Sequence, residues 1–156
     1  MKEMKNQKGS RQIMRNIESP VSAMLDFIEK SVSPYHVTET LKTMLSNRGY
    51  TELRESEEWN LERGGCYFVS RNLSSIIAFR IPEGEPTAFM MAASHSDSPT
   101  FKIKDQTEMS SAGYVRLNTE RYGGMLCSTW LDRPLSVAGK IMVKEGDRLI
   151  SKTVSV

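Results

Sequence analysis

The sequence predicts an α/β domain in which helices pack on a mixed sheet. Three observations predict this class: two stretches with helical periodicity come first, several strand-like runs follow, and one of these runs is apolar on both faces. The 156 residues are 38% hydrophobic and 26% charged, a composition that fits one globular domain with a core of its own. No internal repeat or low-complexity tract indicates another architecture.

Two helices are expected near the start of the chain. Each begins with a Ser-Pro pair, Ser19–Pro20 and Ser33–Pro34, in which serine suits the N-cap and proline suits the first helical position. Gly49 stands where a left-handed residue often ends a helix. The spacing of the apolar residues predicts helices over 20–32 and 34–48. These apolar residues are Val21, Met24, Leu25, Ile28 and Val32 in the first helix and Val37, Leu41, Met44 and Leu45 in the second.

Strands are expected in the remainder of the chain. The runs "CYFVS" and "SIIAFRI" are joined through Arg71, Asn72 and Leu73, which predicts an antiparallel hairpin. The run "TAFMMAAS", residues 87–94, has no polar alternation and is therefore expected to be a central strand covered on both faces. Further short strands are predicted at 100–104, 113–118, 136–144 and 148–154.

Charge and cysteine content limit the functional classes. Lys and Arg total 21 and Asp and Glu total 19, so no strong field favours nucleic acid or an anionic membrane as a partner. The basic start, residues 1–18, is expected to be a flexible terminus. No apolar run has the length of a signal-peptide core or of a membrane helix, which indicates a cytoplasmic protein. Cys66 and Cys127 are isolated and are expected to be reduced thiols.

The stretch "SHSDSP" follows the apolar run at 87–94 and contains the first candidate site. In an extended segment His95 and Asp97 would project from the same face. One ring nitrogen of His95 could then bind a metal while the other donates its hydrogen to Asp97, which would orient the ligand without binding the metal. The alternative is a strand end with ordinary Asp-Ser-Pro turn chemistry. A serine nucleophile activated by His95 is disfavoured, because neighbouring residues of a strand point to opposite sides.

A second candidate cluster is "RYGGMLCSTWLDRPLSVAGK", residues 121–140. Gly123 and Gly124 permit positive φ or close backbone approach, and the sequence "DRPL" places an acid and a base just before a predicted strand. The alternative is a loop with a charge pair between Asp132 and Arg133.

Taken together, the two clusters resemble one family. "ASHSDSPTFKIK" resembles the "HTDSP…K" segment of the aspartyl aminopeptidase and aminopeptidase I family of zinc metallopeptidases, and "YGG…STWLDRPLSVAGKIMVK" resembles its "YGG…WFDRPLSLAGRV" segment. Two earlier stretches, "LDFIEKSVSPYHVTETLKTMLSNRGYTEL" and "WNLERGGCYFVSRNLSSIIAF", are similar to the family's N-terminal segments. The similarity covers about residues 22–145 in the family's order. Ser96 and Leu131 depart from it, standing where threonine and phenylalanine are frequent.

This resemblance implies a specific chemistry. It makes His95 the first ligand of a two-zinc centre and Asp97 a catalytic-site residue whose carboxylate clamps this histidine. Such enzymes remove N-terminal residues, commonly acidic ones, from peptide substrates and assemble as large homo-oligomers. Residues 19–145 are then expected to be the N-terminal part of the catalytic domain of a zinc-exopeptidase fold, and residues 146–156 the start of the segment that leads into the family's inserted domain.

The resemblance also implies a catalytic chain more than twice this length. The bridging aspartate, the general-base glutamate with its neighbouring ligand and the last histidine are expected beyond Val156. His36 lies in the early "SPYH" segment and is expected to be a helix N-terminal or packing residue. A chain with one matched ligand is therefore expected to be inactive alone and to bind zinc weakly. The alternative function is a non-catalytic interaction or assembly module that associates through strand edges and apolar surfaces.

Overall fold

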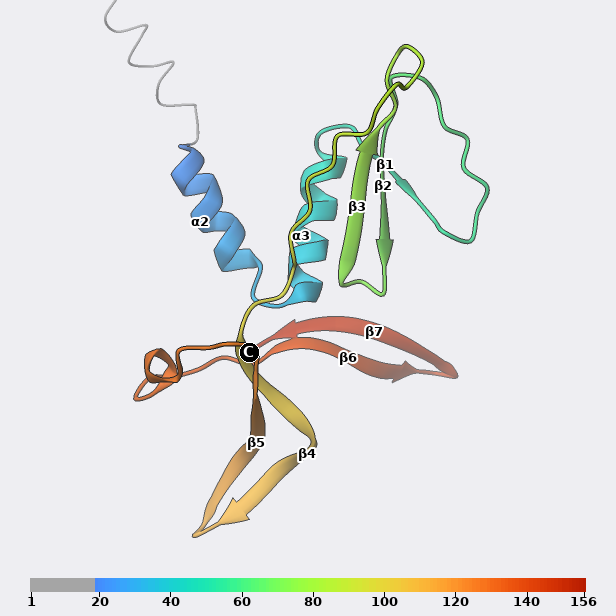
Figure 1. Cartoon of the computed structure of the whole chain (residues 1–156). Helices are drawn as coiled ribbons and strands as arrows, with labels where there is room; N and C mark the ends of the chain where they lie inside the picture. Colours follow the sequence, from blue (N-terminus) through green and yellow to red (C-terminus); the bar gives the residue numbers. More distant parts are fainter. Residues whose placement is uncertain (1–18) are drawn as a thin grey trace, which may run out of the picture.

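The structure, a computed structural model, describes residues 19–156 (Figure 1). The predicted flexible terminus at 1–18 lies outside these residues. Both predicted helices are confirmed as α2 (Pro20–Lys30) and α3 (Pro34–Ser46). No helix in the described part of the chain is long and apolar enough to cross a membrane.

The helix ends follow the predicted capping chemistry. The Ser19 hydroxyl accepts a hydrogen bond from a backbone N–H of the first turn of α2, and the Ser33 hydroxyl does the same for α3. Past the end of α3, Gly49 has φ +81°, a left-handed conformation that costs glycine little. Local sequence therefore fixes where both helices begin and where the second one ends.

The mixed sheet is also confirmed. Its three strands are β1 (Thr51–Leu53), β2 (Cys66–Arg71) and β3 (Ser75–Arg80), in the order β1-β2-β3. β1 and β2 run parallel, whereas β2 and β3 form the predicted antiparallel hairpin. The hairpin turn places both Asn72 and Leu73 at positive φ, the backbone twist that tight hairpins favour.

The core lies where α3 covers β2. Phe68 and Thr38 are fully buried, and Tyr67 and Val69 are buried beside them. Thr38 lies inside α3 and satisfies its hydroxyl by donating to the carbonyl of Pro34 at 3.1 Å. In the described residues these four are the only buried side chains, so this core is small.

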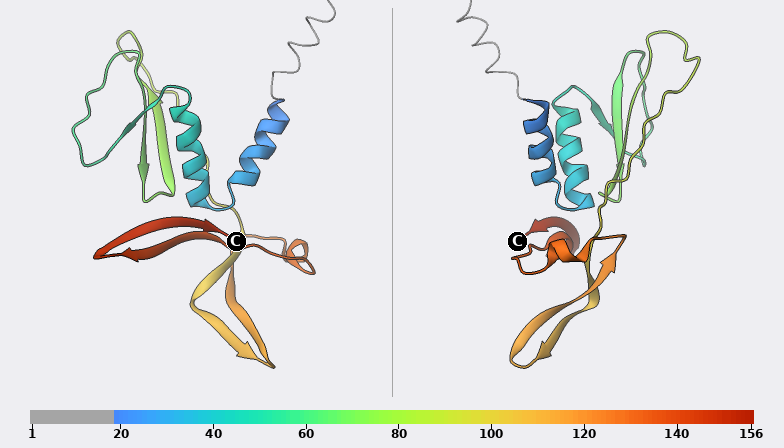
Figure 2. Two further views of the ribbon diagram at one scale, coloured as in Figure 1. Left: turned by 180° about the vertical axis from the view of Figure 1, so that it is seen from behind. Right: turned by 60° about the vertical axis from the view of Figure 1, so that its left-hand side comes forward.

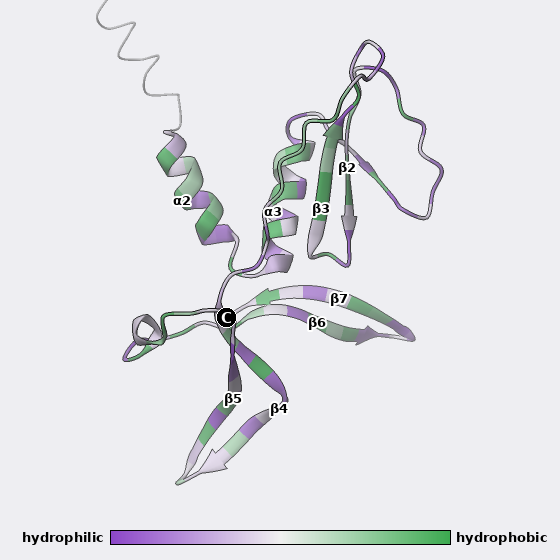
Figure 3. Cartoon of the chain, viewed as in Figure 1, coloured by the Kyte–Doolittle hydropathy of each residue, from purple (hydrophilic) through white to green (hydrophobic). Residues whose placement is uncertain are grey.

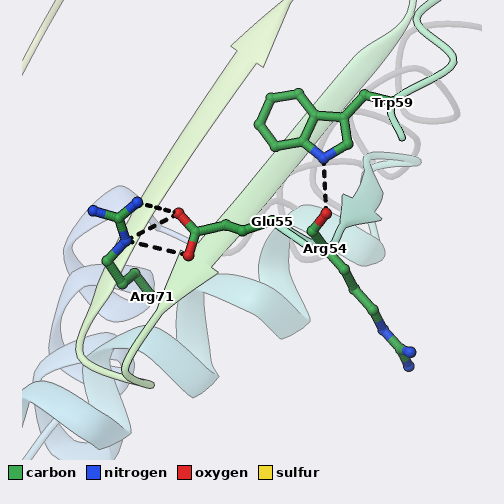
Figure 4. A network of polar contacts seen from close by, with 4 residues as sticks. All are labelled: Arg54, Glu55, Trp59 and Arg71. Carbon is green, nitrogen blue, oxygen red and sulfur yellow. Dashed lines mark hydrogen bonds and ion pairs between the residues drawn. The ribbon is translucent and has the colours of Figure 1, made fainter. Parts of the chain in front are cut away.

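The polar connection between β1 and β2 is held by two contacts (Figure 4). The Arg71 guanidinium at the end of β2 pairs with the Glu55 carboxylate, with Nε to Oε1 at 2.9 Å and Nε to Oε2 at 3.2 Å. The Trp59 indole N–H donates to the carbonyl of Arg54 at 2.8 Å, and its ring stacks on Phe79 of β3. The first half of the connection is thereby tied to the sheet.

The prediction of a buried central strand at 87–94 is wrong. This stretch contains no strand, and the side chains of Phe89, Met90 and Met91 are 90%, 101% and 90% exposed. A strand needs a neighbour to pair with its N–H and C=O groups, and no strand among residues 19–156 pairs with this stretch. It instead carries the chain from the end of β3 back to the other end of the β2–β3 hairpin, where Ser96 contacts Ser74.

Two further hairpins complete the chain. β4 (Thr100–Ser111) pairs with β5 (Tyr114–Tyr122), and β6 (Ala138–Glu145) pairs with β7 (Arg148–Ser155), with the 3-10 helix η1 (Cys127–Trp130) between the two pairs. The four strands predicted here are confirmed, but β4 is much longer than the predicted 100–104. The β4–β5 hairpin extends away from the helices, whereas the β6–β7 hairpin crosses the N-terminal end of α3, where Lys140 Nζ of β6 lies 4.8 Å from the centroid of the Tyr35 ring (Figures 1 and 2).

Much apolar surface is exposed outside the small core. The apolar stripe of α2 faces outward at Val21, Met24, Leu25 and Ile28, each at least 54% exposed. Figure 3 shows apolar segments along α2, which packs against α3. Both free cysteines, Cys66 and Cys127, are half-buried and form no disulfide.

Candidate metal-ligand site at His95

The candidate site lies on a bend between two hairpins. Ser96 anchors this bend, because its hydroxyl donates to the carbonyl of Ser74 at the turn of the β2–β3 hairpin, at 2.9 Å. Three residues after Asp97, the chain enters β4 at Thr100. The site is thus supported by the small sheet on one side and by the β4–β5 hairpin on the other.

His95 and Asp97 are in direct contact. The His95 Nδ1 lies 3.0 Å from the Asp97 Oδ1 and 2.7 Å from the Asp97 backbone carbonyl oxygen. The sequence predicted the side-chain contact from an extended strand, whereas the structure forms it across a bend, which also brings the carbonyl of Asp97 to the ring. The His95 side chain is 79% exposed, so the ring is open to solvent.

The Asp97 carboxylate has a second partner. The Tyr122 hydroxyl, at the end of β5, donates to the Asp97 Oδ2. This hydrogen bond is the main cause that lowers the pKa of Asp97 below its ordinary value. Desolvation opposes it, and a backbone N–H and the His95 ring lower the pKa further. The same contact raises the pKa of Tyr122. Asp97 therefore stays ionised and accepts from both sides.

Tyr122 was not recognised from the sequence, although "RYGG" was. The signal that could have found it is the pairing of the two strands. In the antiparallel register Tyr122 stands opposite Thr100, so it comes close to the "SDSP" stretch that precedes β4. A register of this kind depends on the turn at 112–113, which carries no strong hairpin signal beyond one glycine.

The second cluster contributes to the site only at its start. Gly123 has φ +71°, and a Cβ placed there would lie 3.5 Å from Pro99, so the turn after Tyr122 packs against the site. Asp132 has φ +55° in the loop before β6. Among the described residues neither Asp132 nor Arg133 forms an ion pair, with each other or with the site, so the charge pair considered above is absent there.

The site supplies one possible metal ligand, His95, and not the complete set of ligands that a metal centre needs. Nδ1 of His95 is engaged by acceptors, which leaves Nε2 as the nitrogen that could bind an ion. Within residues 19–156 no group of three or more His, Cys, Asp or Glu side chains could hold a metal. His36 is the expected helix N-terminal residue, with Nδ1 2.7 Å from the Ser33 hydroxyl.

The fold and site can be compared with known proteins. Aspartyl aminopeptidase 1 of Schizosaccharomyces pombe is 42% identical over 137 residues, which are 85% of this chain and 29% of that protein. The Ape4 and Nbr1 complex contains a chain that superposes with a TM-score of 0.81 and 41% identity, over 85% of this chain and 26% of that one. The mApe1 dodecamer of S. cerevisiae superposes with a TM-score of 0.75 and 27% identity, over 90% of this chain and 34% of that one.

The chain spans about a third of the length of the curated relatives it matches. The match to a family model is nevertheless extensive, because the model described as aminopeptidase I zinc metalloprotease (M18) aligns with residues 27–156. These residues include the small sheet, the His95 bend and all four strands of the two hairpins. The chain belongs to the aminopeptidase I (M18) family of zinc metalloproteases.

Proposed function

We propose that this chain is the His95-bearing part of a metal-dependent aminopeptidase that hydrolyses N-terminal, acidic residues from peptides. The observation that carries the proposal is the oriented imidazole: Nδ1 is held by Asp97 while the ring is exposed, in a chain that matches the zinc metalloprotease family. The acidic preference is supported by the relative from S. pombe, which is an aspartyl aminopeptidase.

The proposed roles follow from the contacts of the site. His95 would hold one of two zinc ions through Nε2, and Asp97 would keep the hydrogen on Nδ1 and fix the direction of the ring. Zinc, when bound, supplies Lewis-acid chemistry that polarises a peptide carbonyl and makes water a better nucleophile. No group of three or more possible metal ligands lies among residues 19–156, so the remaining ligands, together with the general base, would come from other residues of the family's catalytic domain.

Assembly and domain organisation complete the proposal. We propose a homo-oligomer, because one structural neighbour is a dodecamer. Residues 19–145 would belong to the catalytic domain, and 146–156 would begin the segment that leads to the inserted domain. This boundary falls at the turn between β6 and β7, which are paired strands. The cytoplasm remains the compartment we expect.

Complementation tests the function. The 156-residue chain, supplied with zinc, is mixed with a polypeptide that carries the remaining two thirds of a family relative, and hydrolysis of aspartyl and leucyl chromogenic substrates is measured. We expect hydrolysis of the aspartyl substrate by the mixture alone, and its loss in the His95→Ala variant. His36→Ala is the matched control, because this ring contacts Ser33 at the start of α3 and not the site. Activity that survives in His95→Ala would contradict the proposal.

A second candidate function is an assembly module without catalysis. The observation that favours it is the exposed apolar surface of residues 89–91 and of α2. The edges of the small sheet and of the two hairpins add backbone groups that another chain could pair with. In this case the chain self-associates and the mixture described above hydrolyses neither substrate.

A further inference from the structure

The protonation state of the His95 ring follows from its partners. Nδ1 faces the Asp97 backbone carbonyl at 2.7 Å and the Asp97 Oδ1 at 3.0 Å. A carbonyl and a carboxylate only accept hydrogen bonds, so Nδ1 must carry the hydrogen that both share. In the neutral ring Nε2 then has a free lone pair, which is the form that binds a metal.

This arrangement requires a carboxylate that stays in place. The torsion about the Cβ–Cγ bond of aspartate is broad, so a carboxylate with one partner can rotate away toward water. Asp97 is restrained on its other oxygen, because the Tyr122 hydroxyl donates to Oδ2. Two donors on opposite oxygens hold the plane of the carboxylate and thereby direct Oδ1 toward the ring.

Tyr122 is itself held by regular structure. It ends β5 opposite Thr100, the first residue of β4, so the hairpin ties its backbone to the chain just past Asp97. Gly123, at φ +71°, turns the chain immediately after Tyr122 and packs beside Pro99. A side chain on a paired strand is a more rigid support than one on the bend that carries His95.

We propose that Tyr122 is a positioning residue that holds the Asp97 carboxylate, so that His95 keeps its hydrogen on Nδ1 and presents Nε2 to a metal ion. This inference rests on the proposed function, because orienting Nε2 has a functional consequence only if His95 binds a metal. The positioning itself is a property of three side chains of this chain and can be measured without any metal.

The test reads the tautomer of His95 directly. The chain has only two histidines, so a sample labelled with nitrogen-15 in histidine gives two imidazole spectra. At a pH of about 8, where an ordinary imidazole is neutral, we expect wild-type His95 to be in the Nδ1–H form. In Tyr122→Phe we expect a shift of the population toward the Nε2–H form, because the carboxylate loses the partner that restrains it.

Matched variants separate positioning from folding. Tyr114→Phe removes a hydroxyl from the same strand at a residue that is 72% exposed, and it should leave the His95 spectrum unchanged. The His36 ring, whose Nδ1 contacts Ser33, reports in each sample whether α3 is still folded. A Tyr122→Phe protein with a wild-type His95 spectrum overturns the inference, whether or not the substitution changes the stability of the fold.

A zinc titration of the same samples separates this inference from the proposed function. We expect zinc chloride to perturb Nε2 of His95 in the wild type, with the midpoint about tenfold higher in Asp97→Asn and raised by a smaller factor in Tyr122→Phe. If zinc leaves wild-type His95 unperturbed while Tyr122→Phe still changes the tautomer, the proposed function fails and the positioning role stands. If zinc binds to His95 equally in both proteins, the positioning role has no effect on the ligand and the inference fails.

Discussion

At the scale of single residues, the site depends on one carboxylate that accepts from two sides. The Tyr122 hydroxyl, first in importance, and then a backbone N–H and the His95 ring favour the ionised form of Asp97, and its pKa is lowered. A group whose pKa is lower in the folded state stabilises the fold above its unfolded pKa, about 3.9 for aspartate. This stabilisation is lost as the pH falls through the lowered folded value.

The pH dependence of these contacts is therefore a prediction with a definite sign. In carbon-13 spectra of the carboxyl groups, Asp97 should titrate below the ordinary range in the wild type and closer to it in Tyr122→Phe, because the main cause of the shift is removed. The Tyr122 pKa is raised by the same contact, so its absorbance change should come at higher pH than that of an ordinary tyrosine. An Asp97 titration that is identical in the two proteins would rule out this contact in solution.

The residue scale also shows how far the sequence predicts the site. His95 and Asp97 were identified because they lie two positions apart, a spacing at which side chains can meet locally. Tyr122 is separated from Asp97 by 25 positions, so its place depends on the register of a hairpin. A contact between residues two positions apart can be predicted from a single sequence. A contact that depends on the register of paired strands can be identified only once the fold is known.

At the scale of elements, two serines near the start of α3 are expected to differ in their effect on stability. Ser33 caps the helix, whereas Ser31 lies in the turn before it. Ser33→Ala should lower the free energy of unfolding by about 1 kcal/mol, because the hydroxyl that accepts from the first turn of α3 is lost. Ser31 is the matched control. Its hydroxyl is buried without a hydrogen-bond partner among the described residues, so Ser31→Ala should change the free energy by no more than about 0.5 kcal/mol or stabilise the chain.

Denaturant titrations followed by circular dichroism measure both variants. A loss in Ser31→Ala as large as that in Ser33→Ala would contradict the assignment of the cap. It would mean that both hydroxyls have partners or that the whole turn between α2 and α3 is sensitive to substitution.

The elements differ in how well the sequence predicts them, and the reason is physical. The starts of both helices were predicted to the residue and their ends two residues too late, because the start signals are local whereas the apolar spacing runs past the last turn. The β2–β3 hairpin was predicted because its signals are also local. The run at 87–94 has the composition of a buried strand, but composition does not supply a pairing partner, and the structure gives it none among residues 19–156.

At the scale of the whole molecule, the burial is small for the apolar content of the chain. The core centres on Phe68, while the three consecutive apolar side chains at 89–91 are almost fully exposed. A stretch composed like a central strand that faces solvent is a strong site for association, either with further parts of the family's fold or with another copy. Within residues 19–156 the outer edges of the β4–β5 and β6–β7 hairpins are also unpaired.

We expect the chain alone to self-associate in a concentration-dependent manner through residues 89–91. Met90→Lys should reduce the average mass measured by light scattering after size-exclusion chromatography, and it should lower the binding of a dye that reports apolar surface. Met90 is 101% exposed, so the substitution removes no internal contact and the free energy of unfolding should stay within about 0.5 kcal/mol of wild type.

Gln106→Lys is the matched control, because it adds the same charge at an exposed position of β4 away from the apolar run. If Gln106→Lys lowers the mass as much as Met90→Lys does, net charge and not the apolar run governs association. If the wild type is a monomer at every concentration, the assembly module is excluded as a function. The exposed run would then be a surface that other parts of a peptidase domain cover.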